Sequence, residues 1–214
     1  VSCDYLSIKD SHATPDTLTW YAGTHSTSVS GNAGWILTAP PATYYWVTGG
    51  TGNWSSNTNW ATSSGGSNGA GVPEASDNVV FDNNSGSGTS TVDADFGGEI
   101  ADFTTGSGAS AFAGTILLGR ALTVSGDFTL ASGTFNAVSY TLSVAGNWTH
   151  TDGTFTCGTG TVDFNGSGTQ VVTYGVDPFY NVTYSGSGTL QLKPAWSYQQ
   201  QITIDKSVVS TAGG

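Results

Sequence analysis

The chain has 214 residues, 9% of them charged, and four basic and fifteen acidic side chains give a formal net charge of −11. Nucleic-acid binding needs clustered Lys and Arg, and the four basic residues are scattered along the sequence, which argues against a nucleic-acid partner. No apolar run reaches the roughly 20 residues of a membrane-spanning helix, so no membrane insertion is expected.

Strand-forming Val, Ile, Thr and aromatic residues, separated by Gly, Ser and Asn, predict an all-β fold. Residues 1–39 are expected to form the end of one β-solenoid module. Pro40 and Pro41 cannot donate backbone hydrogen bonds and interrupt a strand ladder, so residues 40–43 are predicted to be a Pro-rich junction. Residues 44–100 then form a Trp- and Gly-rich β segment that opens the next module.

A 20-residue repeat dominates the second half of the chain, where residues 122–141 and 142–161 align without a gap. This length suits one coil of a parallel β-solenoid, whose short strands hydrogen-bond to the coils on either side. Residues 101–214 are therefore predicted to be stacked coils, and the fold class is a parallel β-solenoid or β-helix with coils of about 20 residues. The register stacks three inward pairs, Leu122 on Leu142, Val124 on Val144 and Phe135 on Phe155.

Glycines recur at fixed places in this repeat. Gly126 and Gly146 align, as do Gly133 and Gly153. Tight turns between strands require positive φ, which glycine reaches without a steric penalty. All four glycines are therefore expected at coil corners with positive φ.

The two ends of the chain contain weaker copies of the coil. Residues 202–214 begin with isoleucines where the repeat has Leu122 and Val124, and residues 3–13 can be laid on residues 179–189. An uncapped coil edge tends to pair with another coil, so the start of one copy is expected to pack against the end of another. The expected assembly interface comprises Val1, Cys3, Tyr5, Leu6, Ile8, Ile202, Ile204, Val208 and Val209.

Several motifs resemble a known group of proteins. The order "YYWVTGGTGNW", "VPEASDNVVFD", "GDFTLASGTF" and "GNWTHTDGTFTCGTGTVDFNGSGTQ" resembles the repetitive parallel β-helix surface proteins of environmental bacteria and some phages, which are adhesin-like or autotransporter-passenger-like. "GNAGWILTAPP" resembles the closing segment of one such module. The resemblance implies coil architecture and a place on the cell surface, and it specifies no activity.

Carboxylates are the first candidates for chemistry, because some parallel β-helices cleave polysaccharides with paired acids. Asp93 and Asp95 could share a strand face with Glu99 nearby, and Arg120 is the one arginine. The preferred interpretation is that these are turn and rim residues and that no catalytic centre exists. The same interpretation covers Asp77, Asp82 and Asp163.

Metal and histidine chemistry is not expected. His12, His25 and His150 lack the partner spacing of a metal site and are interpreted as lone exposed or turn residues. Residues 82–88, "DNNSGSG", could offer oxygen ligands to Ca²⁺ but lack the repeated Asp positions of known calcium loops. No cofactor is therefore expected.

Aromatic residues gather in the first sixty positions, and exposed Trp side chains could stack on sugar rings. The alternative, which we prefer, is that they cap the ends of solenoid modules. The candidate aromatic surface comprises Trp20, Trp35, Trp46, Trp54 and Trp60.

Two features bear on location. Cys3 and Cys157 fit no metal spacing and are interpreted as buried or idle thiols or, alternatively, as a disulfide within or between copies. Low charge and many hydroxyl and amide side chains are common outside cells, and five sequons provide candidate glycosylation sites, Asn53, Asn83, Asn147, Asn165 and Asn181.

Three functions are consistent with these features. The first is a non-enzymatic structural subunit of an extracellular filament, which assembles with itself end to end or as tandem modules of a longer chain. The second is a glycan- or host-binding adhesin or phage-fibre module. The third is a polysaccharide-degrading enzyme.

Overall fold

The computed structural model describes residues 5–15, 17–23, 26–37, 40–173 and 175–193, and the backbone alone of residues 198–204. The chain divides into two compact units, Val1–Ala42 and Thr43–Gly214. Their boundary lies one residue after the Pro40–Pro41 pair. Each unit is described by itself.

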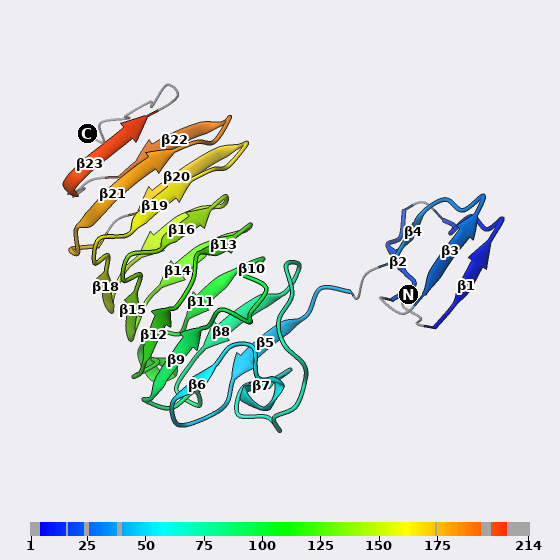
Figure 1. Ribbon diagram of the computed structural model, residues 1–214, viewed down its shortest axis with the longest axis horizontal. Helices are drawn as coiled ribbons and strands as arrows, with labels where there is room; N and C mark the ends of the chain where they lie inside the picture. Colours follow the sequence, from blue (N-terminus) through cyan, green and yellow to red (C-terminus); the bar gives the residue numbers. More distant parts are fainter. Residues whose placement is uncertain are drawn as a thin grey trace. The chain divides into compact units, whose positions relative to one another are not determined.

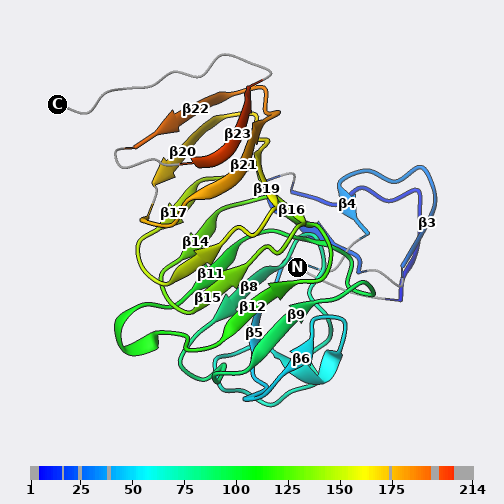
Figure 2. The same cartoon turned by 60° about the vertical axis from the view of Figure 1, so that its left-hand side comes forward.

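The larger unit is a stack of parallel strands, and the structure is all-β, with parallel strands stacked in a β-solenoid of about 9 turns with roughly 20-residue spacing (Figure 1). The predicted fold class is therefore confirmed. Three sheets run along the stack and form its sides (Figure 2).

The eight-stranded sheet has the order β22-β20-β17-β14-β11-β8-β5-β7. Its strands are β5 (Thr43–Trp46), β7 (Trp60–Ala61), β8 (Asn78–Phe81), β11 (Phe103–Thr105), β14 (Phe128–Leu130), β17 (Trp148–His150), β20 (Thr169–Thr173) and β22 (Thr189–Leu192).

The five-stranded sheet has the order β18-β15-β12-β9-β6. Its strands are β6 (Gly52–Asn53), β9 (Thr89–Val92), β12 (Thr115–Leu118), β15 (Thr134–Asn136) and β18 (Thr154–Thr156).

The six-stranded sheet has the order β10-β13-β16-β19-β21-β23. Its strands are β10 (Glu99–Ile100), β13 (Leu122–Val124), β16 (Thr141–Val144), β19 (Thr161–Phe164), β21 (Phe179–Tyr184) and β23 (Tyr198–Ile204), and two short 3-10 helices, η1 (Asn57–Asn59) and η2 (Gly108–Ser110), lie in the connections.

The register of the sheets follows the sequence repeat. Leu122 pairs with Leu142 and Val124 with Val144, and in the five-stranded sheet Phe135 pairs with Phe155. All three predicted pairs are confirmed. The first column continues through the later coils as Val162, Val182 and Ile202, so the predicted alignment of Ile202 with Leu122 is also confirmed.

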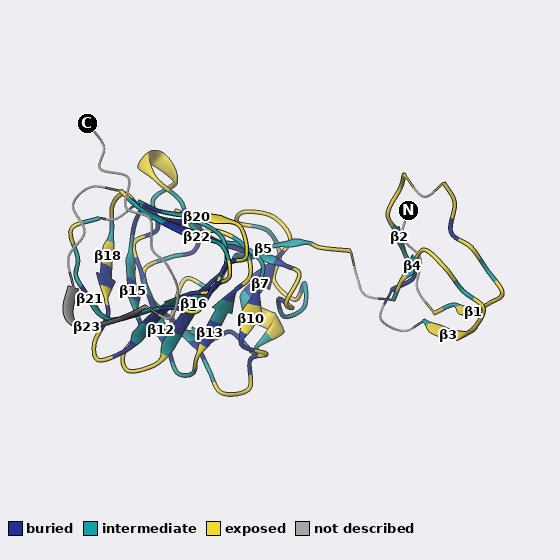
Figure 3. Cartoon of the chain, turned by 90° about the horizontal axis from the view of Figure 1, so that it is seen from above, coloured by how far each residue is buried: buried dark blue, intermediate teal, exposed yellow. Residues whose placement is uncertain are grey.

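Alternation along each strand separates a dry interior from an outer surface (Figure 3). Inside, aromatic rings of successive coils stack. The ring centroids of Phe103 and Phe128 are 4.9 Å apart, and those of Phe128 and Trp148 are 4.3 Å apart, with interplanar angles of 15° and 14°. One coil could not bury these rings, because each ring is covered by the neighbouring coil.

The corner glycines serve two different needs. Gly133 and Gly153 have φ of 68° and 81°, as predicted. Gly126 and Gly146 are not among the positive-φ residues, so the prediction is wrong for them. At Gly146 the requirement is space, because a Cβ there would lie 2.4 Å from the backbone of Gly126, whereas a Cβ on Gly126 would meet mainly the movable carboxylate of Asp102.

The smaller unit contains two pairs of parallel strands, β1 (Ser7–Lys9) with β3 (Thr27–Ser30) and β2 (Trp20–Tyr21) with β4 (Trp35–Ile36). Ser7 pairs with Thr27, which is the same 20-residue step as in the larger unit. Its described residues bury few apolar side chains, namely Ile8, Ala13 and Ala22, while Tyr5, Leu18, Val29 and Ile36 are exposed.

Candidate functional site

An aromatic plug closes the first coil of the larger unit. It consists of Trp46, Trp54, Trp60, Phe81 and Phe96, whose side chains are at most 1% exposed. The ring centroids of Trp46 and Trp60 are 5.0 Å apart and those of Trp54 and Trp60 are 5.3 Å apart, both nearly perpendicular. Perpendicular contacts place the positive edge of one ring on the negative face of the next.

Hydrogen bonds hold the plug in place. The indole N–H of Trp60 donates to the carbonyl oxygen of Trp54 at 2.8 Å, and the indole N–H of Trp54 donates to the hydroxyl of Ser90 at 2.6 Å. Strand β7 carries Trp60 and pairs antiparallel with β5, the only antiparallel pair among the described strands. The chain thus folds back over its own first coil.

The plug corrects part of the predicted aromatic surface. Trp46, Trp54 and Trp60 are fully buried and cannot stack on a ligand, because neighbouring aromatic rings already cover their faces. Trp20 and Trp35 of the smaller unit remain partly exposed, with ring centroids 6.0 Å apart.

The acidic group around Asp93 is built into a turn. Oδ1 of Asp93 accepts a hydrogen bond from the amide of Ser55 at 3.0 Å. Burial alone would raise the pKa of Asp93, but hydrogen bonds from the hydroxyl and amide of Ser55 and from the amides of Asp93 and Asp95 outweigh it and lower the pKa. Stabilising the carboxylate in this way suits a turn and works against a proton donor.

The guanidinium of Arg120 binds backbone carbonyl groups of the same turn. One guanidinium nitrogen donates to the carbonyl oxygens of Ala94, at 3.1 Å, and Phe96. No ion pair between Arg120 and a carboxylate is found among the described residues. Glu99 is exposed and lines a surface hollow with Val72, Pro73, Glu74, Ala75 and Gly97.

The other candidate carboxylates also bind nearby groups of the coils. Oδ2 of Asp77 accepts a hydrogen bond from the amide of Glu74 at 2.9 Å, and Oδ2 of Asp163 accepts one from the hydroxyl of Ser185 at 2.9 Å. In the proposed calcium segment, Oδ1 of Asp82 accepts from the amide of Asn84 at 2.8 Å. The described part of the chain holds no group of three or more His, Cys, Asp or Glu residues placed to bind a metal ion.

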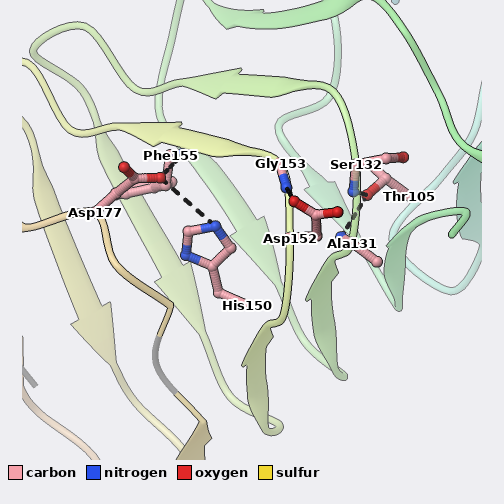
Figure 4. Close-up of polar contacts among 8 residues, drawn as sticks. All are labelled: Thr105, Ala131, Ser132, His150, Asp152, Gly153, Phe155 and Asp177. Atoms are coloured by element: carbon pink, nitrogen blue, oxygen red, sulfur yellow. Dashed lines mark hydrogen bonds and ion pairs between the residues drawn. The ribbon is translucent and has the colours of Figure 1, made fainter. Parts of the chain in front are cut away.

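His150 is the feature that sequence reasoning missed. It was expected to be exposed, but its side chain is 2% exposed, with Nε2 3.6 Å from Oδ2 of Asp177 (Figure 4). The same carboxylate oxygen accepts a hydrogen bond from the amide of Phe155 at 2.7 Å. The repeat contained the signal, because His150 pairs in register with the buried Leu130.

Burial sets the charge of this histidine. Desolvation lowers the pKa of His150, and the carboxylates of Asp177 and Asp152 and the backbone of Gly153 oppose the shift without cancelling it. Its Nδ1 is buried without a hydrogen-bond partner. Figure 4 also shows another tie between coils, in which the Thr105 hydroxyl accepts from the amides of Ala131 and Ser132.

Of the other two histidines, His12 is exposed and forms an isolated bridge with Ala33, and His25 lies outside the described residues.

Cys157 is a free thiol, 8% exposed. Desolvation and the charge of Asp177 raise the pKa of this thiol against opposing backbone hydrogen bonds from Cys157 and Tyr180. Cys3 lies outside the described residues, so a disulfide between the two stays a prediction.

The five candidate glycosylation sites differ in exposure. Three are exposed, Asn53, Asn83 and Asn165, and two are half-buried, Asn147 and Asn181. The side chain of Asn147 is already used within the fold, since its Oδ1 accepts a hydrogen bond from the amide of Val171.

The predicted assembly residues are only partly described. Tyr5 is exposed, Leu6 is half-buried and Ile8 is buried, while Ile202 and Ile204 belong to β23, whose backbone alone is described. The remaining four lie outside the described residues, namely Val1, Cys3, Val208 and Val209.

Comparison with family models, curated proteins and solved structures gave no significant match. The solenoid architecture that the resemblance implied is present, and its surface-protein context stays a prediction. Within the described residues, no helix has the length and apolar character needed to cross a bilayer.

Proposed function

We propose that the chain is a non-enzymatic structural subunit of an extracellular filament that assembles with itself end to end. The observation that carries this proposal is the continuous parallel pairing of the six-stranded sheet, in which each strand from β10 to β23 pairs with the next. Stacked strands add length without changing the cross-section, because each coil repeats the hydrogen bonds of the previous one. Such a stack suits a load-bearing rod.

The polar residues of the larger unit support this proposal. Asp93 accepts a hydrogen bond from the amide of Ser55, which follows β6, and Arg120 donates to the carbonyl oxygen of Ala94 in the turn that follows β9. Gln170, 2% exposed, donates its side-chain amide to the carbonyl oxygens of Val144 at 2.7 Å and Gly146 at 2.6 Å. Each of these groups satisfies backbone atoms at a coil corner, where strand pairing ends. The hydrogen-bonding groups of these side chains are used to hold the coils together.

The test is electron microscopy of the native material together with mass measurement of the purified chain over a range of concentrations. Filaments whose mass per length matches end-to-end copies are expected. A chain that remains a monomer at every concentration, and is found as isolated particles in native material, would contradict the proposal.

A second function, binding of glycans or a host surface, is favoured by Trp20 and Trp35, which are partly exposed and adjacent. Aromatic faces stack on the apolar faces of sugar rings. A soluble polysaccharide should then quench Trp fluorescence in the wild-type chain and in Tyr140→Ala, a control at another exposed aromatic residue. Quenching should be lost in Trp20→Ala. Equal quenching in all three proteins would rule out this site.

A further inference from the structure

We propose that β1 of one copy pairs in parallel with β23 of a second copy, so that the smaller unit of the first copy continues the solenoid of the second. This inference rests on the proposed filament function and specifies its joint. The joint has a direction, because in the described part of the larger unit one end of the stack is closed and the other is open.

The closed end is the one that carries the plug. β7 pairs antiparallel with the outer edge of β5, and the side chains of Trp46 and Trp60 lie over the first coil. A further parallel coil could dock there only by displacing β7 and its buried indoles. Growth through this end would therefore require unfolding of the plug.

The opposite end is open within the part of the chain that the structure describes. There β22 and β23 are the outermost strands of their sheets, and each has a neighbour on one side only. In the column of the eight-stranded sheet where Val172 is fully buried, Leu192 is only half-buried. An added coil would cover Leu192 and pair the free strand edges.

The smaller unit has apolar side chains that its own described residues leave exposed. Below about 40 residues a chain rarely buries enough apolar surface to be stable without a disulfide, a metal or a partner. Its large apolar residues are mostly exposed, with Tyr5 at 77%, Leu18 at 54% and Val29 at 55%. A partner that covers them would supply the missing core.

The strand spacing along the sequence is the same in the smaller unit and at the open end of the larger unit. The pairing of Ser7 with Thr27 has the same 20-residue step as the pairing of Val182 with Ile202. Residues 3–13 also align with residues 179–189, a segment that includes all of β21, the neighbour of β23. β1 thus resembles the strands of the sheet that it would extend.

Among the described strands, β1 has a neighbour on one side only, which is β3. The carbonyl oxygen of Leu6 accepts from the amide of Thr27, and the amide of Asp10 donates to the carbonyl oxygen of Ser30. Backbone groups alternate in direction along a strand, so the amides of Ser7 and Lys9 point away from β3. These amides can pair with the edge of β23.

Chain length favours a second copy as the occupant. Six residue steps lead from Leu37 to Thr43, and they can span about 20 Å when extended. Within the larger unit β5, β8, β11, β14, β17, β20 and β22 follow one another, so β22 lies about 29 Å from β5 at about 4.8 Å per strand. The open end of another copy has no such limit.

The test compares Ser7→Pro with Ser7→Ala in the full chain. Both remove the hydroxyl, but only proline removes the outward amide, and the hydrogen bonds between β1 and β3 remain. The concentration needed for assembly should rise about tenfold or more in Ser7→Pro, because the carbonyl group of β23 that pairs with this amide would be buried without a partner. It should stay unchanged in Ser7→Ala, which keeps the amide. Hydrogen exchange of residues 27–33 should be the same in dispersed Ser7→Pro as in dispersed Ser7→Ala, which checks that proline leaves the smaller unit itself unchanged.

A second measurement needs no variant. Amide exchange of the peptide from Leu6 to Asp10 should slow when wild-type chains assemble. Filaments that form without this slowing, or that form from Ser7→Pro at the wild-type concentration, would overturn the joint and leave the filament function standing. A wild-type chain that never assembles would overturn both.

Discussion

The carboxylate of Asp127 accepts a hydrogen bond from the backbone amide of Asn147, one coil further along the solenoid, at 2.7 Å. The side-chain amide of Asn147 donates to the same oxygen at 3.2 Å. One coil earlier, Asp102 accepts from the amide of Asp127 at 2.8 Å. These side chains form a ladder at the corner between the six-stranded and eight-stranded sheets, where backbone amides would otherwise lack partners.

Removing one rung of this ladder should weaken the solenoid. Asp127→Ala is expected to lower the free energy of unfolding by about 1 kcal/mol, because the amide of Asn147 loses its acceptor at a partly solvated site. Asp127→Asn keeps an acceptor oxygen and should lose less than half as much. Denaturant unfolding followed by circular dichroism measures both, and equal losses would show that the hydrogen bond is not the cause.

Replacing Val138 should raise the free energy of unfolding, whereas replacing Asp127 should lower it. It has φ of 55°, a left-handed conformation that β-branched residues rarely adopt, and Gly158 has φ of 53° one coil later. Val138 is 38% exposed, so shortening it loses little burial.

Val138→Gly and Val138→Asn should therefore each raise the free energy of unfolding by about 0.5–1 kcal/mol, since both residues tolerate this conformation. Val138→Ala keeps a Cβ and should gain less. A lower melting temperature for Val138→Asn than for the wild type would contradict this account.

The sequence predicts the coils well because each residue of a solenoid contacts the residue at the same position in the neighbouring coil, and these positions recur at a fixed spacing. The pairing of Leu122 with Leu142 could be read from the 20-residue spacing alone, since the same inward position recurs in each coil. Phe135 and Phe155 follow by the same reasoning. Periodicity fixes which residues stack without any knowledge of long-range contacts.

Features that break the period could not be read in this way. Strand β7 turns back antiparallel, and nothing in its two residues, Trp60 and Ala61, distinguishes an end plug from an exposed aromatic surface. The contact between His150 and Asp177 joins a strand to a connection outside the repeat. Such contacts depend on the folded path of the chain.

The plug should be a large contributor to stability. Trp60 is fully buried and contacts Trp46, Trp54 and Phe81. Trp60→Ala is expected to lower the free energy of unfolding by about 3–5 kcal/mol, because it removes a large buried ring and leaves a cavity. Trp60→Phe keeps part of the packing and should lose less, and Trp35→Ala, at a half-buried position in the other unit, is the control for general loss of an indole.

Exposure of the core at this end provides an independent readout. Trp60→Ala should bind the dye ANS under conditions in which the wild type and Trp35→Ala do not, because opening the plug uncovers apolar side chains of the first coil. Unchanged dye binding together with unchanged stability would contradict the assignment of Trp60 as the cover of the core.

The buried contact between His150 and Asp177 should make the solenoid sensitive to mild acid. Burial lowers the pKa of His150 in the folded chain below its ordinary value near 6.5. As the pH falls through about 6.5, the unfolded chain therefore takes up a proton before the folded chain does, and the folded state loses stability. The loss ends below the folded-state pKa, and above about 7 the histidine contributes no pH dependence.

His150→Leu tests this directly, because leucine occupies the matching position in the preceding coil. The variant should lose less stability than the wild type between about pH 7 and pH 5, as measured by denaturant midpoints. Asp177→Asn keeps an acceptor for the amide of Phe155 but removes the charge that favours protonation, so its loss should extend to lower pH than in the wild type. Parallel pH profiles for the wild type and His150→Leu would show that His150 does not titrate with folding.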